Sequence, residues 1–157
     1  MAVRAALSFR RKAAGALLLG ACIVLSAGSP AVAEVNSPRV DFMLECQGCH
    51  LPGGTGMPEI SVPRLKGHVS KFLHSAEGRA FLLRVPGVAQ SALSDGRLTA
   101  VMNWMVREFD PENLPADFKD YRIDEVSRWR TQILRNVNQV RGPILEASGF
   151  DPNDGYR

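Results

Sequence analysis

Cys46-Gln47-Gly48-Cys49-His50 is the stretch on which the interpretation of this 157-residue chain depends. Two cysteines separated by two residues and followed directly by a histidine form the attachment motif of c-type haem. The spacing lets both thiols reach the two vinyl groups of one porphyrin, and the adjacent His50 can then bind the iron as its proximal axial ligand. A thioredoxin-like dithiol would need a βαβ setting, and a structural zinc site would need four ligands. The motif therefore predicts one haem c, attached covalently through Cys46 and Cys49.

The N-terminal segment is typical of a secretory signal peptide. Residues 1–12 include four bases and no acid, the apolar run 13–27 follows, and Ala31-Val32-Ala33 closes the segment. A basic region, an apolar region and a small-x-small site in this order mark an exported chain. We expect export by the Sec route, cleavage after Ala33 and a periplasmic location. Because the apolar run is short and rich in Ala and Gly, we expect no stable membrane span after cleavage.

Removal of residues 1–33 changes the charge and the cysteine count. The whole chain has 19 basic and 16 acidic residues, but four of the bases lie in the leader, so 15 bases, 16 acids and a net charge of −1 are left. That balance predicts no nucleic-acid partner. Cys22 leaves with the leader, so Cys46 and Cys49 have no further thiol to pair with. The alternative is a lipobox, Leu19-Gly20-Ala21-Cys22, which would make Cys22 a lipidated N-terminus.

Apolar spacing in the region 34–110 predicts a small helical domain around the attachment motif. The Gly- and Pro-rich stretch 51–58 is expected to be a loop, and Ser94 is a good N-cap for the helix that follows it. The helices expected in this region are Pro38–Glu45, about 69–83 and about 95–109.

The sequence of residues 111–157 predicts a C-terminal helical extension. Apolar residues from Val126 to Val140 recur at steps of three and four, so one long helix is expected over 124–147, kinked or interrupted at Gly142-Pro143. Its apolar face is expected to pack on the haem domain, and docking of a redox partner on that face is the alternative. The closing segment 150–157 is expected to be a frayed tail.

The order of these features over about 36–109 resembles a class I cytochrome c domain. The attachment motif is followed by a Gly-rich loop, a PxLxG-like segment, a helix, a proline turn, Leu93-Ser94-Asp95 and a final helix. The resemblance implies an all-α cytochrome c fold, a small helical domain wrapped around a covalently bound haem, here with the C-terminal helical extension added. It also implies that Phe42 of the first helix packs on Trp104 of the last, because those two helices cross in that fold.

The resemblance further assigns residues to the haem environment. Pro63 falls where a proline carbonyl accepts the N–H of the proximal imidazole, which here would orient His50 and raise its basicity. Leu65 falls at a position that touches the haem edge, and Met105 at a position that lines the haem.

The sixth iron ligand is the place where this sequence departs from the family. The family has Met-Pro shortly before the last helix, and the corresponding pair here is Val85-Pro86. A valine cannot coordinate iron, so the open alternatives are a ligand from elsewhere, a five-coordinate iron, or a weak ligand such as water. The candidate protein ligands are Met57, His68, His74, Met102 and Met105, and each has an ordinary structural role as its alternative.

The sequence predicts a redox protein rather than an enzyme. No Ser-His-acid set, phosphate loop or pair of carboxylates stands out, so the haem would supply the chemistry. The first expectation is a periplasmic monohaem c-type cytochrome that carries one electron from a dehydrogenase-type donor to a downstream acceptor. The alternative rests on Val85, because an open sixth position would suit a haem-based sensor of small ligands or a weak peroxidase. A structural subunit of a larger redox complex is a third alternative.

Overall fold

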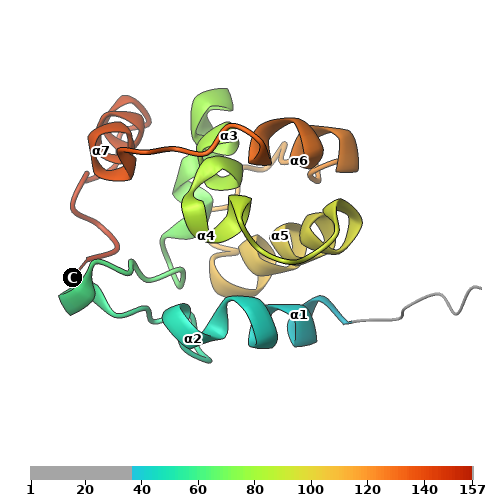
Figure 1. Cartoon of the computed structure of the whole chain (residues 1–157). Coiled ribbons are helices and arrows are strands. Elements are labelled where there is room, and N and C mark those ends of the chain that lie inside the picture. The colour runs from blue at the N-terminus through green and yellow to red at the C-terminus, as the bar shows by residue number, and fades with distance from the viewer. Residues whose placement is uncertain (1–36, 157) are drawn as a thin grey trace, which may run out of the picture. The chain divides into compact units, whose positions relative to one another are not determined.

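The computed structural model describes residues 37–156, which belong to one compact unit, Glu34–Arg157. Predictions about the signal peptide and the lipobox, including Cys22 and cleavage after Ala33, lie outside the described residues. Within residues 37–156 the regular structure is helical, so the predicted all-α fold class is confirmed. The elements are α1 (Pro38–Glu45), α2 (Gln47–His50), η1 (Pro58–Ile60), η2 (Val69–His74), α3 (Ala76–Arg84), α4 (Pro86–Ala89), α5 (Asp95–Phe109), α6 (Ile123–Arg130) and α7 (Val137–Ala147), of which η1 and η2 are 3-10 helices (Figure 1). Among these described helices, none is long and apolar enough to cross a membrane.

Helices α1 and α5 pack against each other, which is the crossing expected of the cytochrome c fold (Figure 1). Phe42 of α1 is 1% exposed, and its ring centroid lies 5.5 Å from that of Trp104 and 5.0 Å from that of Phe109. Tilted aromatic pairs at this separation add stability beyond the area that they bury. The predicted contact between Phe42 and Trp104 is confirmed. A charged link accompanies it, because the buried carboxylate of Asp41 accepts from Arg97 of α5 at 2.5 and 3.2 Å.

Helix α5 has the start and the end that the sequence predicts. The Ser94 hydroxyl accepts the N–H of Arg97 at 3.4 Å and caps the first turn. At the other end, Asp110 precedes a proline, which disfavours a helical backbone at Asp110 itself. The Asp110 carboxylate instead accepts the N–H of Ser70 at 2.8 Å, near the start of η2. The face of α5 that enters the core carries Leu98, Val101, Met102, Met105, Val106 and Phe109.

The single helix predicted over about 69–83 is wrong, because the structure has two elements there, η2 and α3. Ser75 separates them with an extended backbone (φ −140°, ψ 152°), and its hydroxyl accepts the N–H of Gly78 at 3.0 Å. The serine therefore acts as an N-cap and starts a new helix. Apolar spacing runs across this break because the buried side chains of η2 and α3 face the same core.

The single helix predicted over 124–147 is also wrong. Helices α6 and α7 are separate, and the link between them returns to α3, where the buried Leu134 donates its N–H to the carbonyl of Arg84 at 2.9 Å. Helix α7 continues through Pro143 to its end, so that proline does not interrupt it. Helix α6 packs on α3 and α5, whereas α7 packs on α3 and η2. The apolar faces of α6 and α7 are buried at different places, but in the sequence their residues have the spacing expected of one long helix.

Candidate haem-binding site

The attachment motif occupies the turn from α1 into the short helix α2. The N–H groups of Cys49 and His50 donate to the carbonyl of Cys46 at 3.2 and 3.0 Å, so the segment is tightly wound. Both thiols are free, with Cys46 partly buried and Cys49 exposed. Burial, reinforced by the charges of Glu45 and Asp41, raises the pKa of the Cys46 thiol to about 11. This thiol is therefore uncharged at neutral pH.

The imidazole of His50 is oriented by a main-chain carbonyl. Its Nδ1 lies 3.2 Å from the carbonyl oxygen of Pro63. A carbonyl can only accept, so the ring proton lies on Nδ1 and the lone pair of Nε2 is left free. Burial lowers the pKa of His50, and the hydrogen bond to Pro63 opposes that shift. The ring is therefore neutral at neutral pH, which is the state in which imidazole binds a metal.

The Gly- and Pro-rich loop after His50 holds Pro63 in place. Gly56 donates its N–H to the His50 carbonyl at 3.0 Å, and the Gly54 carbonyl accepts the N–H of Leu65 at 2.7 Å. Gly56 has φ +67°, and a Cβ at this position would lie 2.5 Å from the Pro63 carbonyl oxygen, the atom that His50 contacts. Only glycine combines that backbone conformation with that close approach. The loop is therefore a support for the contact between His50 and Pro63.

The other residues assigned to the haem environment lie in the hydrophobic core. Leu65 and Met105 are 8% and 6% exposed, the first just after Pro63 in the chain and the second on α5. Val85 is partly buried at the junction of α3 and α4, where it precedes the first residue of α4. The contacts of Leu65 and Met105 with a haem stay predictions, and Val85 is the residue that stands where the family has its methionine ligand.

The two histidines proposed as sixth iron ligands have other partners. His68 is 2% exposed, and its Nε2 lies 2.7 Å from Nη2 of Arg141. A guanidinium can only donate, so Nε2 is the acceptor and the ring proton lies on Nδ1. Nδ1 is 3.3 Å from the Asp154 carboxylate, an electrostatic contact rather than a well-directed hydrogen bond. His74 is exposed, and its Nε2 is 2.9 Å from the carbonyl of Asn113. His68 would have to leave one of its partners to bind iron, and His74 would have to do so to bind iron through Nε2.

The three methionines proposed as sixth iron ligands remain candidates. Met102 and Met105 are buried on α5, at 1% and 6% exposure. Met57 is partly buried, and its backbone forms an isolated bridge with Val62 in the loop after the motif. A thioether has only weak hydrogen-bonding capacity, so none of these side chains would lose a strong hydrogen bond by turning toward iron, although Met102 and Met105 would lose packing contacts in the core. The sixth ligand stays a prediction.

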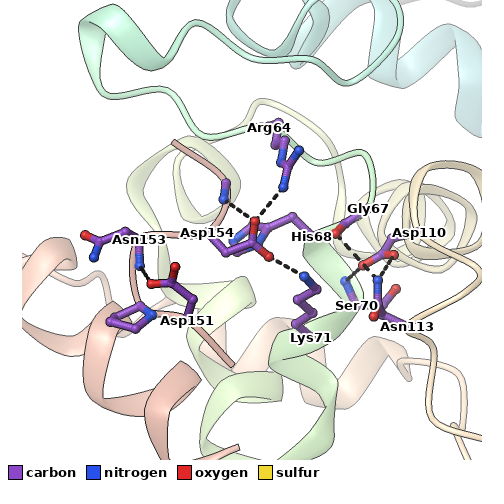
Figure 2. Close-up of polar contacts among 12 residues, drawn as sticks. Arg64, Gly67, His68, Ser70, Lys71, Asp110, Asn113, Asp151, Asn153 and Asp154 are labelled. Atoms are coloured by element: carbon purple, nitrogen blue, oxygen red, sulfur yellow. Dashed lines mark hydrogen bonds and ion pairs between the residues drawn. The ribbon is translucent and has the colours of Figure 1, made fainter. Parts of the chain in front are cut away.

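A cluster of charged side chains that the sequence analysis missed lies beside the Pro63 segment (Figure 2). The Asp154 carboxylate accepts from Arg64 and Lys71 and contacts His68. Burial raises the pKa of this carboxyl, but the hydrogen bonds outweigh burial and hold the pKa well below its usual range. The tail predicted to be frayed is thus anchored, and that prediction is wrong. Arg64, His68 and Lys71 are three basic residues within eight positions, so an acidic partner could have been sought from the sequence.

Arg130 of α6 is a second residue that the sequence analysis missed. Its guanidinium donates to main-chain carbonyls of the connection between α4 and α5 and to a carboxylate at the start of α5. The acceptors are the carbonyls of Ala89 at 3.3 Å, Ser91 at 2.6 Å and Leu93 at 2.8 Å, and the carboxylate of Asp95 at 2.9 Å. Only the short helix α4 lies between this connection and Val85, the position where the family's sixth ligand would lie. No local signal marks Arg130, because main-chain oxygens leave no pattern in a sequence.

The donor set fits a covalently bound haem. Two free thiols with two residues between them, beside a neutral imidazole with Nδ1 on a carbonyl and Nε2 free, are the groups that haem c requires. Zinc, the other group considered for two such cysteines, takes four ligands. Across residues 37–156, no three His, Cys, Asp or Glu side chains are grouped so that they could hold a metal ion.

Comparison with known proteins points to the c-type cytochromes as the class that this fold and site resemble. Over 125 residues the chain is 27% identical to cytochrome c-552 of Thermus thermophilus, and the alignment covers 68% of this chain and 82% of that protein. No protein-family model matches the chain. The similarity is distant, and it agrees with the helical fold.

Proposed function

We propose that this chain is a periplasmic monohaem c-type cytochrome that carries single electrons between a dehydrogenase-type donor and a downstream acceptor. The observation that supports this most directly is the pair of free thiols beside an imidazole whose Nδ1 contacts Pro63 and whose Nε2 is free. The distant similarity to cytochrome c-552 supports the same class. When bound, the haem supplies a one-electron iron couple, so no side chain is assigned a catalytic role.

The residues of the site would divide the work of holding and tuning the haem. Cys46 and Cys49 would hold it through thioether bonds, and His50 would bind the iron through Nε2. The Pro63 carbonyl keeps the proton on Nδ1, fixes the plane of the ring and raises the basicity of Nε2. Leu65, buried just after Pro63 in the chain, would exclude water from this side of the site.

Exposed apolar side chains near the motif support a docking face for the redox partners. Val40, Met43 and Leu44 of α1 are 43%, 49% and 73% exposed, and Cys49 is exposed just beyond them in the chain. Exposed apolar side chains that gather in a patch mark sites of interaction. A small patch suits the short-lived contacts of electron-transfer partners, whose interfaces lie at the low end of the size range.

Covalent haem attachment is the first test. The wild-type chain, produced together with a haem-attachment system, should stain for haem on a denaturing gel, whereas Cys46→Ala/Cys49→Ala should not. Met43→Ala is the control, because it changes an exposed side chain of α1 without touching a thiol. Full staining of the double variant would end the haem c proposal. A stained wild type that shows no reversible one-electron couple in a potentiometric titration would end the carrier proposal.

A sensor of small ligands is the second candidate, and Val85 is the observation that favours it. A peroxidase would need a distal acid–base group; both ring nitrogens of His68 contact other side chains, and Nε2 of His74 contacts the carbonyl of Asn113. The test is the spectrum of the purified protein, with carbon monoxide added to the ferrous form. A low-spin iron that rejects carbon monoxide supports the carrier with a strong sixth ligand from a histidine or a methionine. A high-spin iron that binds it quickly supports the sensor.

A further inference from the structure

The peptide unit between Pro63 and Arg64 is hydrogen-bonded at both of its edges. Its carbonyl oxygen is 3.2 Å from His50 Nδ1, and its N–H donates to the carbonyl of Gly155 at 2.8 Å. The described chain has no cis peptide bond, so this oxygen and this N–H point in opposite directions. The imidazole and the C-terminal tail therefore bind two ends of one planar, conjugated group.

A hydrogen bond at one edge of a peptide strengthens the bond at the other edge. When the N–H donates to an acceptor, the peptide is polarised and its oxygen becomes a better acceptor. A better acceptor at Pro63 draws the Nδ1 proton of His50 more strongly and makes Nε2 a stronger donor to a bound iron. A stronger donor stabilises the ferric state, so the reduction potential falls.

We propose that Gly155 is a positioning residue for the proximal ligand, and that its carbonyl lowers the reduction potential of a haem bound at His50 by acting through the Pro63–Arg64 peptide. This inference rests on the proposed haem function. It assigns a role to the C-terminal tail, which lies outside the region 36–109 that resembles a cytochrome c domain.

The Gly155 carbonyl is held in place by its neighbours. The carboxylate of Asp154 accepts the N–H of Gly155 at 2.9 Å and is itself fixed by the side chains of Arg64 and Lys71 (Figure 2). The guanidinium of Arg141 donates to the carbonyl of Asp154. Because these contacts already order the tail, the hydrogen bond between the Gly155 carbonyl and the Arg64 N–H forms without a further cost in conformational entropy.

Gly155 fits this place only without a side chain. Its φ is +93°, and a Cβ would lie 2.6 Å from Cδ2 of His68 and 2.9 Å from Nη2 of Arg141. Gly155→Ala therefore strains the backbone at this residue and displaces the tail or the side chains of His68 and Arg141, and it changes no charge. Gly149→Ala is the matched control, because Gly149 also has a left-handed backbone (φ +80°) but has no heavy atom within 4 Å of the Cβ position.

The experiment measures two quantities on each haem-loaded full-length variant: the hydrogen exchange of the Arg64 amide and the midpoint potential. In Gly155→Ala the amide should exchange about tenfold faster, the ratio that loss of an ordinary hydrogen bond produces, and the potential should become more positive. Gly149→Ala should leave both unchanged. An exposed Arg64 amide with an unchanged potential would overturn the proposal, because the tail would then be merely structural. An Arg64 amide that stays protected would overturn it as well.

A second pair of variants keeps the proposal testable if Gly155→Ala does not fold. Asp154→Asn weakens the anchor of the tail, and Asp120→Asn makes the same change of charge at a carboxylate that is 60% exposed and paired with Arg107. An exposed Arg64 amide with an unchanged potential in Asp154→Asn, or an Arg64 amide that stays protected, would overturn the proposal. Asp120→Asn is the reference for both measurements. A wild type that carries no covalent haem on a denaturing gel would defeat the proposed function instead. Exchange of its Arg64 amide would still report whether the tail protects the peptide.

Discussion

Replacement of Phe42 by alanine tests whether the crossing of α1 and α5 is centred on this ring. Phe42 is 1% exposed and packs on both Trp104 and Phe109. Loss of a buried aromatic side chain costs about 2–3 kcal/mol in transfer free energy, and the cavity left between two helices adds to it. Because two aromatic contacts also disappear, Phe42→Ala should lower the free energy of unfolding by about 4 kcal/mol, within the usual range for such a change.

The assay is urea unfolding of the haem-loaded protein, followed by far-ultraviolet circular dichroism. Leu44→Ala is the matched control, because Leu44 lies on the same helix, is 73% exposed and should change the free energy of unfolding by less than about 0.5 kcal/mol. Phe42→Leu should fall between the two. A loss below about 1 kcal/mol for Phe42→Ala, or one no larger than that for Leu44→Ala, would refute the packing argument.

Three further predictions concern the supports of the site. Arg130→Met should lower the free energy of unfolding by about 2 kcal/mol in urea, because three partly buried carbonyls and one carboxylate lose their donor, whereas the exposed Arg122→Met should have almost no effect. Stability should fall as the pH drops from about 6.5 toward about 4, because burial and the charge of Arg141 lower the pKa of His68 to about 4, so that the unfolded chain takes up a proton that the folded chain does not. Thermal melts across that range should show the slope, and His68→Gln should flatten it. Gly56→Ala should reduce the yield of haem-stained protein, because its Cβ would strike the Pro63 carbonyl, whereas Gly53→Ala should not, because its Cβ would meet only a Thr55 methyl at 3.7 Å.

Each of these three has an outcome that contradicts it. Equal urea midpoints for Arg130→Met and Arg122→Met would mean that water replaces the guanidinium at no cost. A pH slope that persists in His68→Gln would assign the titration to another group. A Gly56→Ala variant that attaches haem as well as Gly53→Ala would show that the loop yields without disturbing the contact between Pro63 and His50.

Local signals were sufficient to predict the central part of the fold. Cys46, Cys49 and His50 are adjacent in sequence, so their spacing already describes the turn that the structure shows. The Ser94 cap and the apolar face after it are likewise properties of one short segment, and α5 starts there as expected. The aromatic contact between Phe42 and Trp104 could be predicted only because the order of motifs supplied the crossing of two helices.

The errors lie where distant parts of the chain determine local structure. The break at Ser75 is an exception, because it depends on a local cap in which the serine hydroxyl accepts the N–H of Gly78, and apolar spacing does not indicate whether a serine caps a helix or continues it. Helices α6 and α7 are separated by a link in which Leu134 donates its N–H to the carbonyl of Arg84, far earlier in the chain. The anchored tail depends on Asp154 meeting cations far upstream. A single sequence shows which side chains are charged but not which of them come together, and for the same reason it does not identify a sixth ligand for the proposed haem.

The contact between Arg64 and Asp154 joins residues 90 positions apart, close to the end of the chain. A polypeptide is synthesised from its N-terminus, so the two attachment cysteines exist long before the residue that completes the support of their neighbouring histidine. Until Gly155 has been synthesised, only the loop supports Pro63, and the N–H of Arg64 lacks the carbonyl to which it donates in the folded protein. The support of His50 therefore forms in two stages: the local contacts of residues 50–65 can form first, and the hydrogen bond from Arg64 to Gly155 is added only after the chain between these two residues has been made.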